Sequence, residues 1–305
     1  MDQQDSYSQL TPMMIQRVRE GLAAARDRAV RHSIETALHQ VTGITQGEME
    51  HRVDGRIRRG VLRSLIHACF RVRVESSGYI PQEPAILAAN HLNHLDPFLL
   101  LAEVPTQPYY YILGDARTLY NQGWKRQILR PSGGVIPLAR WWREEKAVIA
   151  AAKEGRDDLV ELATAIEQNV PSGGDIQTLR QIDRIIQAIL TRGDGLILFP
   201  EGRLGSTEGT LHLPLKRGIA IYAMRAGVPI VPVVIIGTHD LYLGKELTLR
   251  FGQPLRFPQG NRPKRQDVEA ALEVLQNALM ALLPLDYQEP TGVKLFRNFL
   301  NHMLC

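Results

Sequence analysis

The sequence predicts an α/β protein with a mixed, largely parallel sheet covered by helices, and with a helical segment at its N-terminus. From Arg71 onward, short apolar runs alternate with stretches of helical spacing, a pattern typical of strands connected through helices. The expected strands cover residues 85–90, 108–113, 195–199, 229–236 and 247–251. With 305 residues, 44% hydrophobic and 22% charged, the chain is long enough for one large α/β domain with an appendage, or for two domains.

Residues 1–70 are expected to form the helical N-terminal segment. After a tail that ends near residue 11, Pro12 opens a helix that continues to about Val41, and a second helix follows a break at residues 43–47. The second helix has an apolar stripe made of Ile57, Val61, Leu62, Leu65, Ile66, Cys69 and Phe70. Around it lie Arg52, Arg56, Arg58, Arg59, Arg63, Arg71 and Arg73, with Asp54 as the one acid. This composition favours either a membrane-interface helix or a helix that packs on the α/β domain.

Residues 71–305 are expected to form the α/β domain, interrupted by a helical insert at about residues 142–192. The insert has two helical parts joined at residues 171–174, and Asp175 has the residue type and the position of an N-cap for the second part. That part has an apolar stripe made of Ile176, Leu179, Ile182, Ile186 and Ile189. Covering the core is the simplest role for such a stripe, and regulation or dimerisation is the alternative.

Targeting signals are absent from the sequence pattern. No apolar stretch reaches the roughly 18 residues that a transmembrane helix needs, and the longest run, residues 227–237, contains two prolines and is typical of a buried strand. The first thirty residues lack the apolar core of a signal peptide. Two cysteines give no disulfide framework, and the formal net charge is +4. We therefore expect a protein without a transmembrane helix or a signal peptide, located at the cytoplasmic face of a membrane as a peripheral protein.

A polar string after the strand at residues 85–90 supplies candidate catalytic residues. The string N-H-L-N-H-L-D occupies residues 90–96, so His91 and Asp96 lie on the turn between a strand and the next helix and can meet by a hydrogen bond. A carboxylate that keeps one ring nitrogen protonated leaves the other nitrogen free to take a proton from a hydroxyl. The pair is therefore a candidate general base with its orienting acid.

A second polar string, F-P-E-G-R at residues 199–203, follows the strand at residues 195–199. Gly202 permits a tight turn that exposes the side chains beside it. Arg203 suits bidentate binding of a phosphate group. Because both strings stand at the ends of strands and both carry charge, we expect them to form one composite site.

Four blocks, in this order, resemble the glycerolipid acyltransferases, a family typified by bacterial 1-acylglycerol-3-phosphate acyltransferase. The first is N-H-x-x-x-x-D at residues 90–96, and the second is G-V-I-P-L-A-R at residues 134–140. The third is F-P-E-G-R at residues 199–203, with Lys216 downstream, and the fourth is V-P-I-V-P-V at residues 228–233. The resemblance covers roughly residues 70–257. Four ordered blocks are far more specific than any one of them.

The resemblance implies an O-acyltransferase of phospholipid biosynthesis. It would move a fatty acyl group from acyl-CoA or acyl carrier protein to the hydroxyl of a lysophospholipid (1-acylglycerol 3-phosphate) or of glycerol 3-phosphate. His91 and Asp96 would be the catalytic residues, and the residues implied in substrate binding are Asn90, Arg140, Glu201, Gly202, Arg203 and Lys216. No cofactor and no metal are implied. The partners would be the acyl-thioester donor, the phosphate-bearing acceptor and an anionic membrane surface, but no nucleic acid.

The chain departs from the family's pattern on the acceptor side. Leu204 stands where many members have the arginine of the third block, Asn93 stands where a serine is common, and Ala139 replaces a commonly acidic neighbour of Arg140. The chain also has no Gly-x-Ser-x-Gly elbow, and neither cysteine is in a nucleophile setting. Direct transfer without an acyl-enzyme is therefore the expected mechanism.

Two other functions compete with acyl transfer. His91, His94 and Asp96 form a His-x-x-His-x-Asp string, which predicts a metal-dependent hydrolase if further ligands are nearby. A non-catalytic lipid-binding protein on the same fold is the other alternative, although the intact His91, Asp96 and Glu201 argue against it.

Overall fold

The computed structural model describes residues 10–48 and 52–304, so most of the expected N-terminal tail lies outside the described residues. The chain divides into two compact units, each built from two stretches of sequence. Unit 1 contains the described residues up to Arg52 together with Leu113–Ile185. Unit 2 contains Val53–Ile112 together with the described residues from Ile186 onward. This grouping differs from the domain boundary expected at residue 70, which stays a prediction.

The described strands form one mixed sheet in the order β1-β7-β6-β2-β5-β3-β4. They are β1 (Arg71–Glu75), β2 (Ile86–Ala89), β3 (Tyr110–Asp115), β4 (Val135–Leu138), β5 (Gly195–Leu198), β6 (Ile230–Ile236) and β7 (Glu246–Phe251). The pairs β1–β7, β2–β5, β2–β6 and β3–β5 are parallel, whereas β6–β7 is antiparallel. The predicted fold class, α/β with a mixed and largely parallel sheet, is confirmed.

The register of the central strands brings both polar motifs to one edge of the sheet. Ile86 of β2 pairs with Leu196 of β5 on one side and with Ile230 of β6 on the other. Because these strands are parallel, the residues that follow them emerge at the same edge, where ligands bind in open α/β sheets. All three strands are buried along their whole length, which is typical of a sheet covered on both faces.

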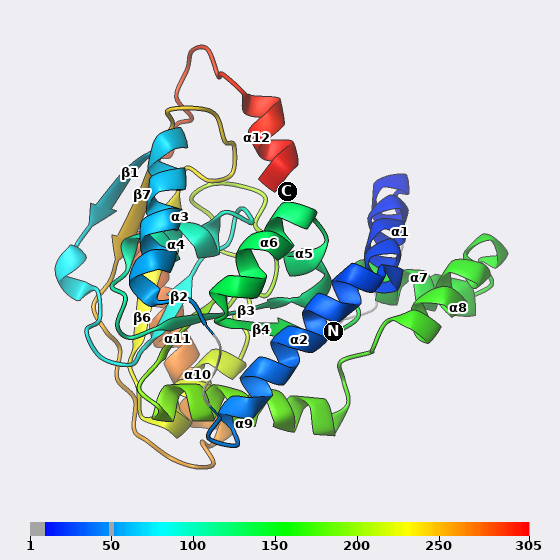
Figure 1. The fold of residues 1–305 in the computed structure, drawn as a ribbon, viewed down its shortest axis with the longest axis horizontal. Helices are drawn as coiled ribbons and strands as arrows, with labels where there is room; N and C mark the ends of the chain where they lie inside the picture. Colours follow the sequence, from blue (N-terminus) through cyan, green and yellow to red (C-terminus); the bar gives the residue numbers. More distant parts are fainter. Residues whose placement is uncertain (1–9, 49–51, 305) are drawn as a thin grey trace. The chain divides into compact units, whose positions relative to one another are not determined.

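The helices of unit 2 include one that begins at the predicted catalytic aspartate. They are η1 (Ser77–Tyr79), α3 (Gly55–Cys69), α4 (Asp96–Glu103), α10 (Gly218–Ala226), α11 (Arg265–Leu282) and α12 (Arg297–Leu304). In Figure 1, α3 lies beside α4. Arg63 and His67 of α3 both hydrogen-bond the carboxylate of Glu103 at the end of α4, at 2.5 and 2.7 Å. These bonds fix the position of α4 and therefore of its first residue, Asp96.

The apolar stripe predicted on α3 is split between two environments. Part of it packs against the protein, because Leu62, Ile66 and Phe70 are buried. The other part stays in solvent: Ile57, Val61 and Leu65 are 60%, 51% and 53% exposed. The exposed residues are spaced four apart and therefore share one face of the helix. Packing on the domain thus accounts for only part of the stripe.

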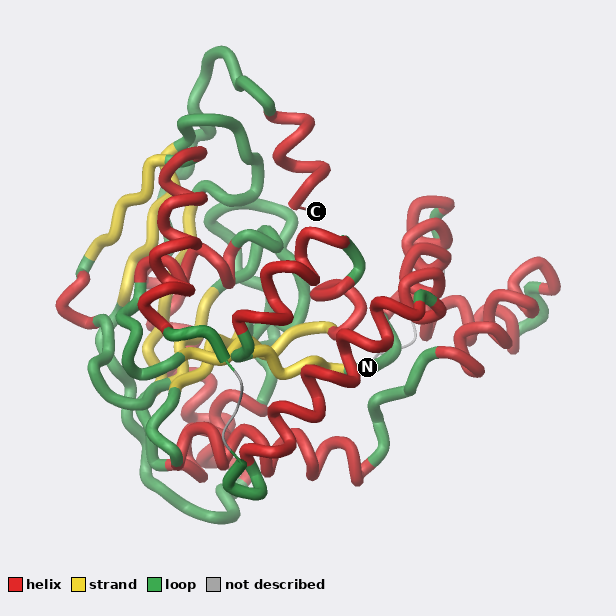
Figure 2. Tube along the Cα trace, viewed as in Figure 1, coloured by secondary structure: helices red, strands yellow, loops and turns green. Residues whose placement is uncertain are grey.

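Two helices replace the single helix that the sequence predicted between residues 12 and about 41. Unit 1 contains α1 (Pro12–Arg26), α2 (Arg28–Ile44), α5 (Ala116–Tyr120), α6 (Gly123–Ser132), α7 (Arg143–Lys153), η2 (Asp157–Leu159) and α8 (Val160–Asn169). The prediction of one continuous helix is wrong because Asp27 ends α1 and caps α2. Its Oδ1 atom accepts the backbone N–H groups of Ala29 and Val30, at 2.7 and 3.1 Å. The two helices accordingly run in different directions (Figure 2).

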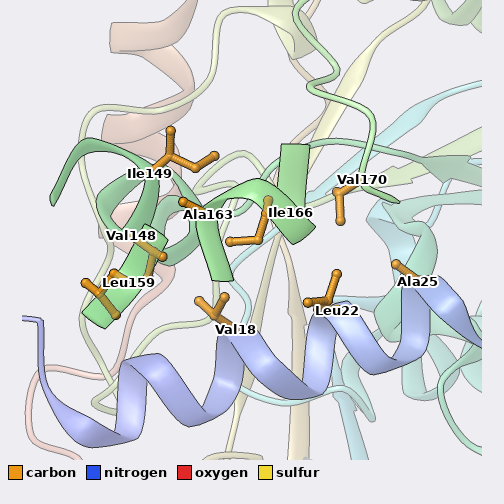
Figure 3. Packing of buried hydrophobic residues seen from close by; sticks show 9 residues of the cluster. All are labelled: Val18, Leu22, Ala25, Val148, Ile149, Leu159, Ala163, Ile166 and Val170. Carbon is orange, nitrogen blue, oxygen red and sulfur yellow. The ribbon is translucent and has the colours of Figure 1, made fainter. Parts of the chain in front are cut away.

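The first part of the predicted insert packs against the N-terminal helix within unit 1. Figure 3 shows Val18 and Leu22 of α1 facing residues of α7 and α8. The buried cluster consists of Val18, Leu22, Ala25, Val148, Ile149, Leu159, Ala163, Ile166 and Val170. The apolar face of α1 is therefore used for packing inside the protein.

The second part of the predicted insert is α9 (Ile176–Thr191). Its predicted N-cap is confirmed, because the Asp175 carboxylate accepts the backbone N–H groups of Gln177 and Thr178, each at 2.9 Å. The predicted stripe is buried over its C-terminal part, at Ile182, Ile186 and Ile189, whereas Ile176 and Leu179 are exposed. The predicted role of covering the core is therefore confirmed for the C-terminal part of the stripe alone.

Candidate active site

His91 and Asp96 form a hydrogen-bonded pair at the carboxyl end of β2, as the motif led us to expect. Nδ1 of His91 lies 2.9 Å from Oδ2 of Asp96, and the two side chains are 16% and 0% exposed. Because an ionised carboxylate only accepts hydrogen bonds, Nδ1 carries the proton and Nε2 keeps a lone pair. The ring of Phe199 stacks on that of His91, with centroids 4.0 Å apart. The pair therefore has a defined tautomer and a defined ring plane.

The turn between β2 and α4 is folded around the Asp96 carboxylate. Oδ2 also accepts the backbone N–H groups of Leu92 and Asn93, at 2.7 and 2.8 Å. The Asn93 side chain accepts the N–H of Leu95 at 2.9 Å, which tightens the same turn. Three donors converge on one buried oxygen, so the carboxylate that orients His91 is itself held in place.

Glu201 connects the two polar motifs through their backbones. Oε1 accepts the N–H of His91 at 3.0 Å, and Oε2 accepts the N–H of His212 at 2.7 Å. Burial raises the pKa of this carboxyl above the ordinary glutamate value, and the two amide hydrogen bonds oppose that rise. Both oxygens are thus engaged inside the protein, where they shape the site. The role in substrate binding expected for Glu201 stays a prediction.

Asn90 joins the ends of β2 and β6. Its Nδ2 donates to the carbonyl of Ile235 at 2.9 Å, and its Oδ1 accepts the N–H of the same residue at 2.7 Å. This pair of bonds continues the sheet by one rung beyond the last paired residues of β2. Asn90 is buried, so it holds two strand ends in register, and its predicted contact with substrate stays a prediction.

Gly202, Arg203 and Lys216 form a cationic turn after β5. Gly202 has φ of +68°, and a Cβ there would come within 2.8 Å of Cε of Lys216, so the lysine side chain crosses the turn at the glycine. The backbone of Lys216 is fixed by a 2.7 Å hydrogen bond from its N–H to the carbonyl of Pro200. Both cationic side chains are exposed. Nη2 of Arg203 lies 2.9 Å from Nδ1 of His212.

Arg140 belongs to unit 1, whereas the other predicted binding residues belong to unit 2. Its carbonyl accepts a 3.0 Å hydrogen bond from Nη2 of Arg117. Gly173 packs closely against it, since a Cβ on Gly173 would lie 2.5 Å from Cβ of Arg140. The Arg140 side chain is exposed, and its predicted part in acceptor binding stays a prediction.

The His-x-x-His-x-Asp string does not form a metal-ligand cluster in the described structure. The rings of His91 and His94 are 6.2 Å apart between centroids and lie at 76° to one another, and Nδ1 of His91 is engaged by Asp96. Within residues 10–48 and 52–304, no three His, Cys, Asp or Glu side chains gather in a way that could hold a metal ion. The geometry therefore favours the pairing of His91 with Asp96 over a ligand role for both.

Sequence reasoning missed two residues near these motifs. His212 belongs to none of the predicted motifs, yet it contacts both Glu201 and Arg203. Glu208 also belongs to no predicted motif. Its Oε1 accepts the N–H groups of Gly237 and His239 at 2.8 and 3.0 Å, and burial raises its pKa to about 7. Both lie in loops whose composition gives no periodic signal of burial, so only the folded chain reveals their contacts.

Comparison with known proteins identifies the family. The family model described as Acyltransferase matches residues 71–236, just over half of the 305 residues. The chain belongs to the acyltransferase family. The match includes β2 and β5 and with them both motifs of the site, so His91, Asp96 and Glu201 lie inside the region that the family model matches.

Curated relatives of this chain are identical to it at about a quarter of the aligned positions. The 1-acyl-sn-glycerol-3-phosphate acyltransferase of Cocos nucifera is 26% identical over 207 residues, covering 68% of this chain and 53% of the relative. The 1-acyl-sn-glycerol-3-phosphate acyltransferase alpha of Homo sapiens is 27% identical over 187 residues, covering 60% and 53%. The chain thus spans about half the length of the curated relatives it matches.

One solved structure is similar at lower identity. The 1-acyl-sn-glycerophosphate (LPA) acyltransferase PlsC from Thermotoga maritima is 18% identical, with a TM-score of 0.42, over 91% of this chain and 89% of that chain. At this TM-score the likeness carries no further conclusion.

Proposed function

We propose that this acyltransferase moves a fatty acyl group from an acyl thioester, acyl-CoA or acyl carrier protein, to the hydroxyl of 1-acylglycerol 3-phosphate or of glycerol 3-phosphate. The observation that carries the proposal is the 2.9 Å hydrogen bond between His91 and Asp96 at the edge where both motifs emerge. The names of the curated relatives support 1-acylglycerol 3-phosphate as the acceptor. The proposed transfer uses no resident cofactor or metal, since the thioester is a substrate.

In the proposed reaction, Nε2 of His91 takes the proton of the acceptor hydroxyl as its oxygen attacks the thioester carbonyl carbon. Asp96 stabilises the imidazolium that forms and keeps the ring in the required tautomer. Collapse of the tetrahedral intermediate breaks the carbon–sulfur bond, and the imidazolium returns its proton to the leaving thiolate. The products are one new ester and one free thiol. A thiol reagent therefore measures the reaction directly: release of thiol from acyl-CoA should depend on adding the acceptor, and release that ignores the acceptor would argue against transfer.

The cationic turn after β5 is the proposed site for the acceptor's phosphate. Arg203 and Lys216 are exposed there. Arg203 lies two positions after Glu201, and the side chain of Lys216 lies against Gly202. Glu201 itself binds the backbone of His91, so the proposed phosphate site and the proposed base are connected through one carboxylate. Arginine supplies planar paired donors and lysine a point charge, which suits a phosphate dianion.

Replacing Arg203 by Ala should raise the acceptor KM by roughly ten- to a hundredfold, because one charged hydrogen-bonding partner is lost. The donor KM should stay within about twofold of the wild-type value. Arg140→Ala is likewise expected to raise the acceptor KM and to leave the donor KM nearly unchanged. Steady-state kinetics with each substrate varied in turn provides the measurement. Arg265→Ala, which removes an exposed arginine paired with Glu269 on α11, is the control; a rise in donor KM alone would refute the assignment.

The exposed face of α3 is the proposed contact with a membrane surface, where acyl acceptors reside. No helix in the described parts of the chain is long and apolar enough to cross a membrane. Ile57, Val61 and Leu65 project from α3 into solvent, and exposed Arg56 precedes them. An apolar face beside basic residues fits the boundary between anionic headgroups and acyl chains.

The arginines of α3 do not all belong to this surface. Arg58 is buried: its Nη1 donates to the carbonyl of Tyr110 at 3.1 Å, and its guanidinium lies over the ring of Tyr109. Arg63 pairs with Glu103. Arg58 is therefore not available to lipid, and charge reversal at Arg58 or Arg63 would disturb packing as well as any lipid contact.

Changing Ile57, Val61 and Leu65 to Ser should reduce binding to anionic vesicles by about tenfold or more, because the apolar area available for insertion is lost. Added salt should weaken wild-type binding by screening the arginines. Vesicle flotation measures both effects. Val274→Ser with Met280→Ser, which removes comparably exposed apolar residues from α11, is the matched control. Equal loss in both variants, or binding that ignores lipid charge and salt, would rule out α3 as the contact.

A further inference from the structure

His212 holds the side chain of Arg203 by a direct hydrogen bond. Nη2 of Arg203 lies 2.9 Å from Nδ1 of His212. A guanidinium only donates hydrogen bonds, so Nδ1 must be the acceptor. The imidazole of His212 is consequently neutral in this arrangement, with its proton on Nε2. His212 is the partner that gives the exposed Arg203 side chain a defined direction.

The backbone of His212 is anchored by the carboxylate that also anchors His91. Oε2 of Glu201 accepts the N–H of His212 at 2.7 Å, and Oε1 accepts the N–H of His91 at 3.0 Å. A second link joins the same loops, because the N–H of Gly205 donates to the carbonyl of His91 at 2.6 Å. A Cβ on Gly205 would lie 3.3 Å from that carbonyl and 3.8 Å from Cδ2 of His212. The two histidines are therefore held on either side of one buried carboxylate.

Fixing a long cationic side chain changes how well it binds. An exposed arginine loses much rotamer freedom when it binds a ligand, and this loss weakens binding. A partner that already fixes the guanidinium removes part of that cost. The bond to His212 uses one of the five N–H donors of Arg203, so others remain for the oxygens of a phosphate.

We propose that His212 is a positioning residue for recognition of the acceptor's phosphate: it fixes the Arg203 guanidinium at a set place relative to His91. The proposal rests on the proposed function, because it assigns a residue to the phosphate side of that site. The proposal also predicts selectivity for acceptors that carry a phosphate, since an acceptor without a phosphate gains no affinity from a positioned arginine.

Four variants test the proposal: His212→Ala, His212→Asn, Arg203→Ala and the double variant His212→Ala/Arg203→Ala. In Asn, the side-chain oxygen stands close to the place of Nδ1 and can accept the same hydrogen bond. His212→Ala should raise the KM for 1-acylglycerol 3-phosphate about fivefold, the effect of one ordinary hydrogen bond. This is less than the effect expected for Arg203→Ala, because the arginine itself remains. The Asn variant should restore most of the lost affinity. The double variant should behave like Arg203→Ala alone, because the two residues act through one interaction.

Several readouts separate positioning from a structural effect. The value of kcat, the donor KM and the turnover of a phosphate-free monoacylglycerol should not change in His212→Ala, and thermal unfolding should show a folded protein, since the anchored group is the backbone N–H. His32→Ala, which removes an exposed histidine of α2, is the control. The proposal is overturned if His212→Ala leaves the acceptor KM unchanged, if its effect adds to that of Arg203→Ala, or if kcat falls instead.

Binding without turnover distinguishes failure of this proposal from failure of the proposed function. Calorimetric titration with glycerol 3-phosphate measures phosphate binding directly, and the His212→Ala variant should bind it more weakly than the wild type while His212→Asn does not. If the wild type transfers no acyl group but shows this pattern, the proposed activity fails and the role of His212 stands. If the wild type binds no glycerol 3-phosphate and no 1-acylglycerol 3-phosphate, the role of His212 fails.

Discussion

Replacing His91 by Ala should lower the rate of acyl transfer by about a hundredfold or more, the lower range for the loss of a general base. The substitution removes the ring whose Nδ1 is bound to Asp96 and whose Nε2 would take the acceptor's proton. The fold should survive, because the backbone N–H of His91 still reaches Glu201. Initial rates of thiol release at saturating donor and acceptor provide the measurement.

His94→Ala is the matched control, since it removes a second histidine from the same turn. Its ring lies 6.2 Å from that of His91, and it is His91 whose Nδ1 is bound to Asp96. We expect His94→Ala to keep most of the activity. Equal inactivation of the two variants, together with stoichiometric metal in the purified wild type, would support the hydrolase alternative instead.

Asp96→Asn should also lower kcat by about a hundredfold or more, with little change in the acceptor KM. An amide can still accept the N–H groups of Leu92 and Asn93, so the turn can keep its shape. Because all three donors meet at one oxygen, the amide oxygen takes that place and the NH2 group points away from Nδ1. The amide therefore keeps the tautomer of His91 but cannot stabilise an imidazolium by charge. The expected loss therefore lies in the chemical step.

The control for Asp96→Asn is Glu103→Gln, which removes a carboxylate from the other end of α4. Glu103 pairs with Arg63 and His67, so its loss should lower thermal stability. If activity depended on Asp96 only because the carboxylate stabilises α4, the two variants would lose activity in proportion to their loss of thermal stability. We expect instead that Asp96→Asn keeps more stability and loses far more activity than Glu103→Gln.

The strands that position the site were predictable because they are buried, whereas two others were not. β2, β5 and β6 are continuous apolar runs that end in polar motifs. β1 was missed because R-V-R-V-E contains only two apolar residues, and it becomes a strand by pairing in parallel with β7. β4 was missed as a strand because V-I-P-L has only four residues and one of them is Pro137, whereas the seven-residue apolar run of β6 is long enough to indicate a strand in spite of Pro232.

The hydrogen bond between His91 and Asp96 was predictable because both partners lie on one short turn. The contacts of Glu201 were not, since they join residues that are 110 and 11 positions away in the sequence. Likewise, no local pattern shows that Asn90 binds the backbone of Ile235, or that His212 faces Arg203. The local sequence was therefore enough to predict the chemistry of the motifs. Which of their polar atoms form hydrogen bonds within the protein depends on long-range contacts, which a local pattern does not show.

The most direct test of the account is a single-turnover experiment with an acyl-labelled thioester, using acyl-CoA and acyl carrier protein in parallel. The enzyme is mixed in excess over the donor, with and without 1-acylglycerol 3-phosphate, and quenched in acid at successive times. Direct transfer through His91 and Asp96 predicts that label passes from donor to phosphatidate only when the acceptor is present, and that the protein fraction carries no label at any time. Label bound to the protein before product forms, or label released as free fatty acid without phosphatidate, would contradict it.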